Sequence, residues 1–187
     1  MKTTLESPSE IRQQIWKELG RATQDRHHAW RTPVLSTVNA EGLVNARTVV
    51  LRHVDADAKQ LQIYTDTRSC KVAELQSQAN AVFVFWSARL RWQLRVRVLT
   101  TILTEGPDVK RLWERVKQSA SAGDYLTIAA PGTPILSDEK VVSQDEEQIS
   151  HFALINARVV EIDWLELARS GHRRARITAD DWQWLTP

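Results

Sequence analysis

Cysteine is nearly absent from the 187-residue chain: Cys70 is the only one, so an internal disulfide is excluded. One thiol and no evident secretory leader are typical of a reducing compartment, and we expect a cytoplasmic protein. Apolar runs are short, and the longest, Ala81 to Trp86, is far from the roughly 20 residues that cross a bilayer. Lys and Arg number 25 against 23 Asp and Glu, so net charge favours no polyanionic partner.

Motifs of the common nucleotide and metal sites are also missing. The chain has no G-x-G-x-x-G, no phosphate loop that ends in Gly-Lys-Ser/Thr, and no C-x-x-C. Its five histidines do not stand at the i, i+4 spacing of a zinc protease. We therefore expect no metal site, and the chemistry must come from other residues.

Regular elements are predicted along most of the chain. Ser7 and Glu10 form a capping box ahead of a first helix, whose Ile11, Ile15 and Leu19 share one face. Period-two patterns and turn residues predict strands over 32–38, 43–53, 61–65, 81–87, 90–103, 152–162 and 173–178. Further helices are predicted over 69–78, after Gly106, and over 137–147. These elements predict a single α+β domain, residues 1–187, around a barrel-like antiparallel sheet.

Two segments suggest an anion site. Arg47 and Arg52 stand at the ends of an otherwise apolar strand, and their odd spacing predicts opposite faces. Alternatively, both are ordinary strand-end arginines. The segment Tyr64–Lys71 runs from a strand into a helix start that holds hydroxyls and cations, as a phosphate site requires. The alternative there is simple capping by Ser69.

Two further segments are basic. Arg89, Arg91, Arg95 and Arg97 alternate with apolar residues, so they share a strand face and need acidic neighbours or a bound polyanion. Nucleic acid is one interpretation of this face. A second cluster, Gly171 to Arg176, follows Trp164 and is by itself typical of a solvated surface.

Taken in order, these segments resemble one family, the pyridoxamine 5'-phosphate oxidase-like flavoproteins. The motifs are R-x-V-x-L-R at 47–52, Y-T-D-x-R-S-x-K at 64–71, Q-x-R-V at 93–96, and W-x-x-L followed by H-R-R-A-R over 164–176. The resemblance implies an FMN-binding split barrel, α+β with peripheral helices, for which we expect six to eight strands. It also implies a homodimer with FMN at the subunit interface.

The resemblance implies FMN contacts from both motif blocks. In it, Arg47 and Lys71 bind the FMN phosphate, and Trp164 with Arg174 or Arg176 reaches FMN from the second subunit. The full set of implied FMN contacts is Arg47, Thr48, Val49, Val50, Leu51, Arg52, Tyr64, Thr65, Arg68, Ser69, Cys70, Lys71, Gln93, Trp164, Arg174 and Arg176.

Departures from the family pattern bear on the substrate. Cys70 stands where the family has an arginine before the phosphate lysine, and His172-Arg173-Arg174 replaces the R-x-H that holds pyridoxamine phosphate. We therefore predict an FMN-dependent oxidoreductase with an unidentified small-molecule substrate, and assign no catalytic residue. Two alternatives stay open: a genuine pyridoxine/pyridoxamine 5'-phosphate oxidase, and a nucleic-acid or anion-binding module without flavin. No membrane association is expected.

Overall fold

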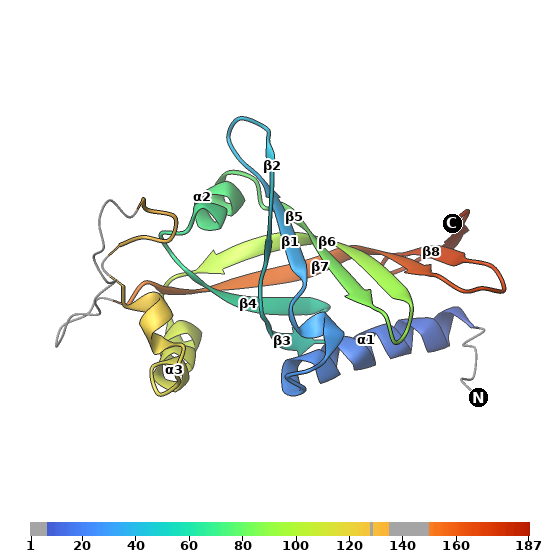
Figure 1. The fold of residues 1–187 in the computed structure, drawn as a ribbon, viewed down its shortest axis with the longest axis horizontal. Coiled ribbons are helices and arrows are strands. Elements are labelled where there is room, and N and C mark those ends of the chain that lie inside the picture. The colour runs from blue at the N-terminus through green and yellow to red at the C-terminus, as the bar shows by residue number, and fades with distance from the viewer. Residues whose placement is uncertain (1–6, 128, 135–149) are drawn as a thin grey trace.

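The structure, a computed structural model, describes residues 7–127, 129–134 and 150–187 (Figure 1). Three α-helices are present in these ranges, α1 (Pro8–Gln24), α2 (Cys70–Ser77) and α3 (Pro107–Val116), with short 3₁₀ turns η1 (Ala29–Arg31) and η2 (Ala122–Tyr125). The strands are β1 (Val34–Val38), β2 (Val44–Thr48), β3 (Leu51–Asp55), β4 (Gln60–Asp66), β5 (Asn80–Ser87), β6 (Trp92–Leu103), β7 (Phe152–Glu166), β8 (Arg173–Ile177) and β9 (Trp182–Leu185).

The strands form one antiparallel sheet in the order β2-β1-β5-β6-β7-β4-β3, and a β8–β9 hairpin branches from β7. Long β7 makes this branching possible: its first half pairs with β4 and its second half with β8, while β6 runs along its other edge. The sheet does not close, as in a split barrel, which confirms the predicted α+β architecture. α2 and α3 lie at one end of the elongated molecule and β8 at the other (Figure 1).

The predicted single strand over 43–53 is wrong. The chain pairs with β1 as far as Thr48 and then joins β4 from Leu51, at the opposite end of the strand order. Between them, the Val49 N–H donates to the Pro33 carbonyl, 3.0 Å away. The run Thr48 to Leu51 is uniformly suited to a strand, so its sequence carries no sign of the change of partner. The argument that put Arg47 and Arg52 on opposite faces of one strand fails with it, because the two residues lie on different strands and both line one groove.

The alternation along β6 is confirmed. Trp92, Leu94 and Val96 are buried, whereas Arg95 and Arg97 are exposed. β7 supplies the acids that the arginines require: Arg95 pairs with Asp163, and Arg97 lies 3.6 Å from Glu161. The arginine face therefore has its counter-charges within the chain, which removes the argument for a polyanion there.

The main core lies between the sheet and α1, which packs against β3. The predicted face of α1 is confirmed, with Ile11, Ile15 and Leu19 fully buried, and so is its capping box. A smaller apolar cluster joins α3 and η2 to the start of β7.

The predicted number of strands is too low. The described residues hold nine strands rather than six to eight, since β2 and β3 are separate and β9 was not predicted. The predicted helix over 137–147 lies outside the described residues. No helix in the described ranges is long and apolar enough to span a membrane.

Candidate functional site

A groove of about 280 Å³ lies where the β2–β3 link, the end of β4, the start of α2 and η2 meet. This volume is close to the lower end of the roughly 300–1,000 Å³ of small-molecule sites. Nine of the predicted site residues line it: Arg47, Thr48, Val49, Val50, Arg52, Tyr64, Thr65, Ser69 and Lys71. The change of strand partner at 48–51 is what places 47–52 beside 64–71.

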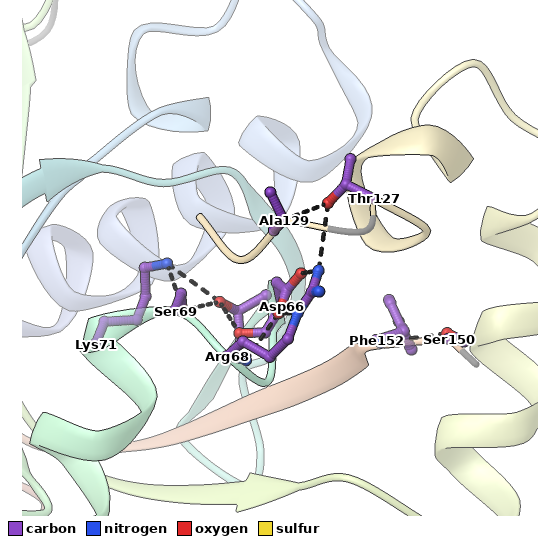
Figure 2. Close-up of polar contacts among 9 residues, drawn as sticks. Asp66, Arg68, Ser69, Lys71, Thr127, Ala129, Ser150 and Phe152 are labelled. Atoms are coloured by element: carbon purple, nitrogen blue, oxygen red, sulfur yellow. Dashed lines mark hydrogen bonds and ion pairs between the residues drawn. The ribbon is translucent and has the colours of Figure 1, made fainter. Parts of the chain in front are cut away.

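Lys71 is the cation at the α2 end of the groove. Its Nζ donates to Ser69 Oγ at 3.0 Å and to Thr65 Oγ1 at 3.2 Å (Figure 2). Burial lowers the pKa of Lys71, and the nearby positive charge of Arg47 lowers it further. Two neutral hydroxyls do not balance an ammonium in a partly buried place, so the position suits an added anion.

The start of α2 is open to a ligand. Ser69 is the N-cap residue, but its side chain makes no capping hydrogen bond, and the first turn holds no acid. The Ser69 hydroxyl instead contacts Thr65 and Lys71. Capping by the Ser69 hydroxyl, the alternative explanation of this segment, is therefore wrong. The N–H groups and positive dipole end of an α-helix start favour an anion.

Arg47 reaches the same end of the groove from β2. Its Nη2 lies 3.1 Å from Glu74 Oε2, and its Nη1 donates to Thr37 Oγ1. Asn45 Nδ2 donates to the other Glu74 oxygen at 2.6 Å. Burial raises the pKa of Glu74, but hydrogen bonds from Thr37 and Asn45 together with Arg47 lower it overall, so this carboxylate stays ionised. Arg47 is thus held by a buried acid that does not itself line the groove.

Arg52 occupies the other end of the groove. Its guanidinium carbon lies 5.3 Å from the centre of the Tyr64 ring, a cation–π contact. Burial raises the pKa of Tyr64, and Arg52, Arg115 and Arg111 oppose the rise. The same pattern holds at Tyr125, where burial raises the pKa and Arg52 opposes it. Three guanidinium groups therefore act on one phenol at this end.

Arg68 and Cys70 lie beside the groove but do not line it. Arg68 forms a salt bridge with Asp66 at 2.8 Å and donates to Thr127 at 3.2 Å (Figure 2). Asp66 also accepts from the Arg68 backbone N–H, so the pair closes the turn between β4 and α2. Cys70 is exposed at the first position of α2. Leu51 is fully buried in the main core.

The second predicted block is elsewhere in this chain. Gln93 lies on β6, and Arg174 and Arg176 lie on β8. Arg174 forms two hydrogen bonds with Asp163, at 3.0 and 2.7 Å, and Arg176 donates to Gln183 at 2.6 Å. Trp164 is fully buried in the main core and packs edge-on against Trp92, so its side chain does not lie in the groove. One chain does not bring the two blocks together.

Several groove and network residues were missed by sequence reasoning. Asp66, Asp124, Tyr125 and Pro131 also line the groove, and Glu74 and Thr37 stand behind it. Glu74 lies among the buried positions of α2, so the hydrophobicity pattern of this helix could have indicated a buried acid close to its cationic start. Tyr125 offers no such signal, because η2 is a single turn after α3.

An open antiparallel sheet with peripheral helices and a cation-lined groove beside a helix start defines a class, the small split-barrel proteins. A family model described as the FMN-binding domain of pyridoxamine 5'-phosphate oxidase matches residues 13–104, about half of the chain. This match places residues 13–104 in the pyridoxamine 5'-phosphate oxidase-like, FMN-binding family. The predicted family and the predicted cofactor, FMN, are both confirmed.

Curated relatives match over a limited segment. A pyridoxine/pyridoxamine 5'-phosphate oxidase of Roseobacter denitrificans is 46% identical over 63 residues, which cover 34% of this chain and 30% of that protein. One of Caulobacter vibrioides is 38% identical over 71 residues, or 38% of this chain and 31% of the relative. The matched segments span about a third of these relatives.

Solved structures match along the whole chain. A pyridoxamine 5'-phosphate oxidase-related, FMN-binding protein from Nostoc punctiforme is 25% identical, with a TM-score of 0.74 over 98% of this chain and all of that one. PhzG from Burkholderia lata, solved with tetrahydrophenazine-1-carboxylic acid, has the same TM-score at 17% identity and covers 100% of this chain and 99% of its own. The latter shows the fold alone.

The groove residues fit FMN. A phosphate monoester needs cations and N–H donors, and the α2 end offers Lys71, Arg47 and a helix start without an acid. Val49 and Val50 give the middle of the groove apolar and main-chain surface. Riboflavin alone would leave the partly buried Lys71 ammonium with only the two hydroxyls as hydrogen-bond partners among the described residues.

Proposed function

We propose that the protein is an FMN-dependent oxidoreductase that acts on a small anionic molecule. The observation that carries the proposal is the partly buried Lys71 ammonium, which has two hydroxyl partners among the described residues and faces an uncapped helix start. Bound FMN supplies the redox chemistry, and the protein supplies orientation and electrostatics.

In this proposal the α2 end of the groove holds the FMN phosphate. Lys71 and Arg47 donate charge-assisted hydrogen bonds to it, and the first-turn N–H groups add their dipoles. The 48–50 backbone lies along the flavin, and Thr65 and Ser69 keep the Lys71 ammonium turned toward the phosphate. Arg68, which is paired with Asp66, orders the turn rather than contacting FMN.

Arg52 is proposed to bind the substrate's anionic group. It is held by the Tyr64 ring, and its charge also acts on the buried Tyr125 phenol, while Arg111 and Arg115 add positive potential. A carboxylate or a phosphate ester matches this fork of donors. Tyr64 and Tyr125 both pack on Phe152, so the wall of the groove is aromatic and rigid.

We also propose a homodimer. Gln93, Arg174 and Arg176 lie away from the groove of their own chain, so they can serve an FMN site only across a subunit interface. Exposed apolar side chains support an interface: Val44 and Val160 border a second groove of about 420 Å³ between the β1–β2 hairpin and the β6–β7 strands. Light scattering that shows a monomer at micromolar concentration contradicts this proposal.

The test of the proposed function compares two ligands and a candidate substrate. The purified protein should carry FMN, and after its removal should bind FMN far more tightly than riboflavin, as measured by flavin fluorescence. Equal affinity for the two flavins would refute the phosphate site. Reduction of the bound flavin by anionic candidates, followed anaerobically by loss of its visible absorbance, then tests the oxidoreductase activity.

A genuine pyridoxine/pyridoxamine 5'-phosphate oxidase is the second candidate. The names of the curated relatives favour it. Peroxide release with pyridoxamine 5'-phosphate, at a rate that Arg52→Met lowers, would establish it. If this compound does not reduce the bound flavin, the broader proposal requires a different anionic substrate.

A further inference from the structure

Glu74 is a buried carboxylate that no family motif assigns. It lies in the middle of α2 and is only 7% exposed, and its carboxylate accepts hydrogen bonds from Thr37 on β1 and Asn45 on β2. It does not line the groove, yet it contacts a residue that does. A buried acid is costly unless it is paired and hydrogen-bonded, so its partners indicate why it is there.

The partners of Glu74 form a directed chain of hydrogen bonds. Thr37, which is 1% exposed, donates its one hydroxyl proton to Glu74 Oε2 at 2.5 Å. The Thr37 oxygen in turn accepts from Arg47 Nη1, while Arg47 Nη2 donates directly to the same Glu74 oxygen at 3.1 Å. Two N–H groups of Arg47 are therefore fixed by one carboxylate and one hydroxyl.

Arg47 has little else to hold it. Among the described strands, β2 is terminal in the sheet order and pairs with β1 alone, so no second described strand packs beside its side chains. Its residues at 44, 46 and 48 are exposed. An arginine on such a strand samples many rotamers unless specific contacts select one, and ordering it on binding weakens affinity.

We propose that Glu74 is a positioning residue, which acts through Thr37 to fix Arg47 in the conformation that binds a phosphate monoester. The proposal rests on the assignment of the FMN phosphate to Arg47 and Lys71. This role opposes the direct electrostatic effect of Glu74, because a carboxylate near a phosphate repels it and by itself weakens FMN binding. The network orients Arg47 before FMN arrives, so that its remaining N–H donors face the groove.

Two substitutions separate positioning from charge. Glu74→Gln keeps the size of the side chain and removes its charge, so the charge-assisted hydrogen bonds that fix Arg47 are replaced by weaker ones to a neutral amide. Thr37→Val keeps both charges and the shape, and removes only the bridging hydroxyl. Each should weaken FMN binding by about 3- to 20-fold, because pre-orientation of charge-assisted donors is lost, and leave riboflavin binding within about twofold.

A double-mutant cycle tests the route through Arg47. In an Arg47→Met background, Glu74→Gln should no longer weaken FMN binding, since there is no guanidinium left to position. The apoprotein of the double variant should also unfold at a higher temperature than Arg47→Met alone, because the latter leaves the buried Glu74 carboxylate without its cation. Glu41→Gln, which neutralises an exposed acid of the β1–β2 hairpin, is the matched charge control and should change neither affinity.

The outcomes are distinct. Equal losses of FMN and riboflavin affinity, or a loss that persists beside Arg47→Met, would show a merely structural role and overturn the proposal. Tighter FMN binding by Glu74→Gln alone would show that repulsion prevails, which also overturns it. If instead Arg47→Met and Lys71→Met both leave FMN affinity unchanged, the phosphate site itself fails, and with it the proposed function.

Discussion

Replacing Lys71 by methionine should change FMN affinity and apoprotein stability in different directions. A hydrogen bond to a charged group is worth roughly 1.5–3 kcal/mol, which corresponds to about ten- to a hundredfold weaker FMN binding. Burial lowers the pKa of Lys71, so holding it charged at neutral pH costs folding free energy that methionine does not. The apoprotein of the variant should therefore be at least as stable as the native one.

The assay pairs fluorescence titration of FMN and riboflavin with thermal unfolding of the apoprotein. We expect a large loss for FMN, little change for riboflavin, and an unfolding temperature that does not fall. Lys71→Arg is the conservative control and should retain most of the FMN affinity. A fall in apoprotein stability alongside losses for both flavins would mean that Lys71 supports the turn instead, and would refute the electrostatic reasoning.

Three further outcomes are expected, two at the groove and one at a buried acid of α1. The ratio of FMN to riboflavin affinity should fall as the pH rises toward the lowered pKa of Lys71, and Lys71→Arg should abolish this fall; a ratio that is flat to pH 10 contradicts it. Arg52→Met should raise the KM of an anionic substrate at least about tenfold with FMN affinity unchanged, whereas an unchanged KM removes Arg52 from the substrate site. Glu18→Gln should cost about 1–3 kcal/mol in denaturant unfolding, because the carboxylate is 1% exposed and accepts from four side chains, including His28 at 2.7 Å. Burial raises the pKa of Glu18, but His28 and Arg89 lower it overall. The stabilisation from this carboxylate is therefore present above the unfolded value of about 4.5 and is lost as the pH falls through the lowered pKa. A difference in unfolding free energy between variant and native protein that is the same at pH 3 and pH 7 would contradict this.

The sequence predicted local features well where one residue pattern decides them. The capping box at Ser7 and Glu10 starts α1, and the alternation from Trp92 separates the buried and exposed faces of β6. These features depend on neighbours within a few residues along the chain. The acids that balance Arg95 and Arg97 lie on β7, about 65 residues later, so only the need for them was predictable.

The groove could be predicted in its residues but not in its geometry. The motifs at 47–52 and 64–71 named nine of the residues that line it. They could not show that β2 ends at Thr48, since Val49 and Val50 suit either a continued strand or a crossing. Nor could they show Tyr125, which reaches the groove from a short turn, or Glu74, a helix residue whose role depends on contacts with Thr37 on β1 and Asn45 on β2.

The two ends of the groove differ in the way their cations are held, and this difference favours two separate anions. At the α2 end, Lys71 is held by hydroxyls and Arg47 by Glu74, so both cations come with polar partners that can turn donors toward one fixed group. At the other end, Arg52 lies on the face of Tyr64, a contact that leaves its in-plane N–H donors free of any carboxylate among the described partners. A resident phosphate is suited to the first arrangement and an exchanging substrate to the second, because a guanidinium without a competing acid binds and releases an anion with no internal pair to break.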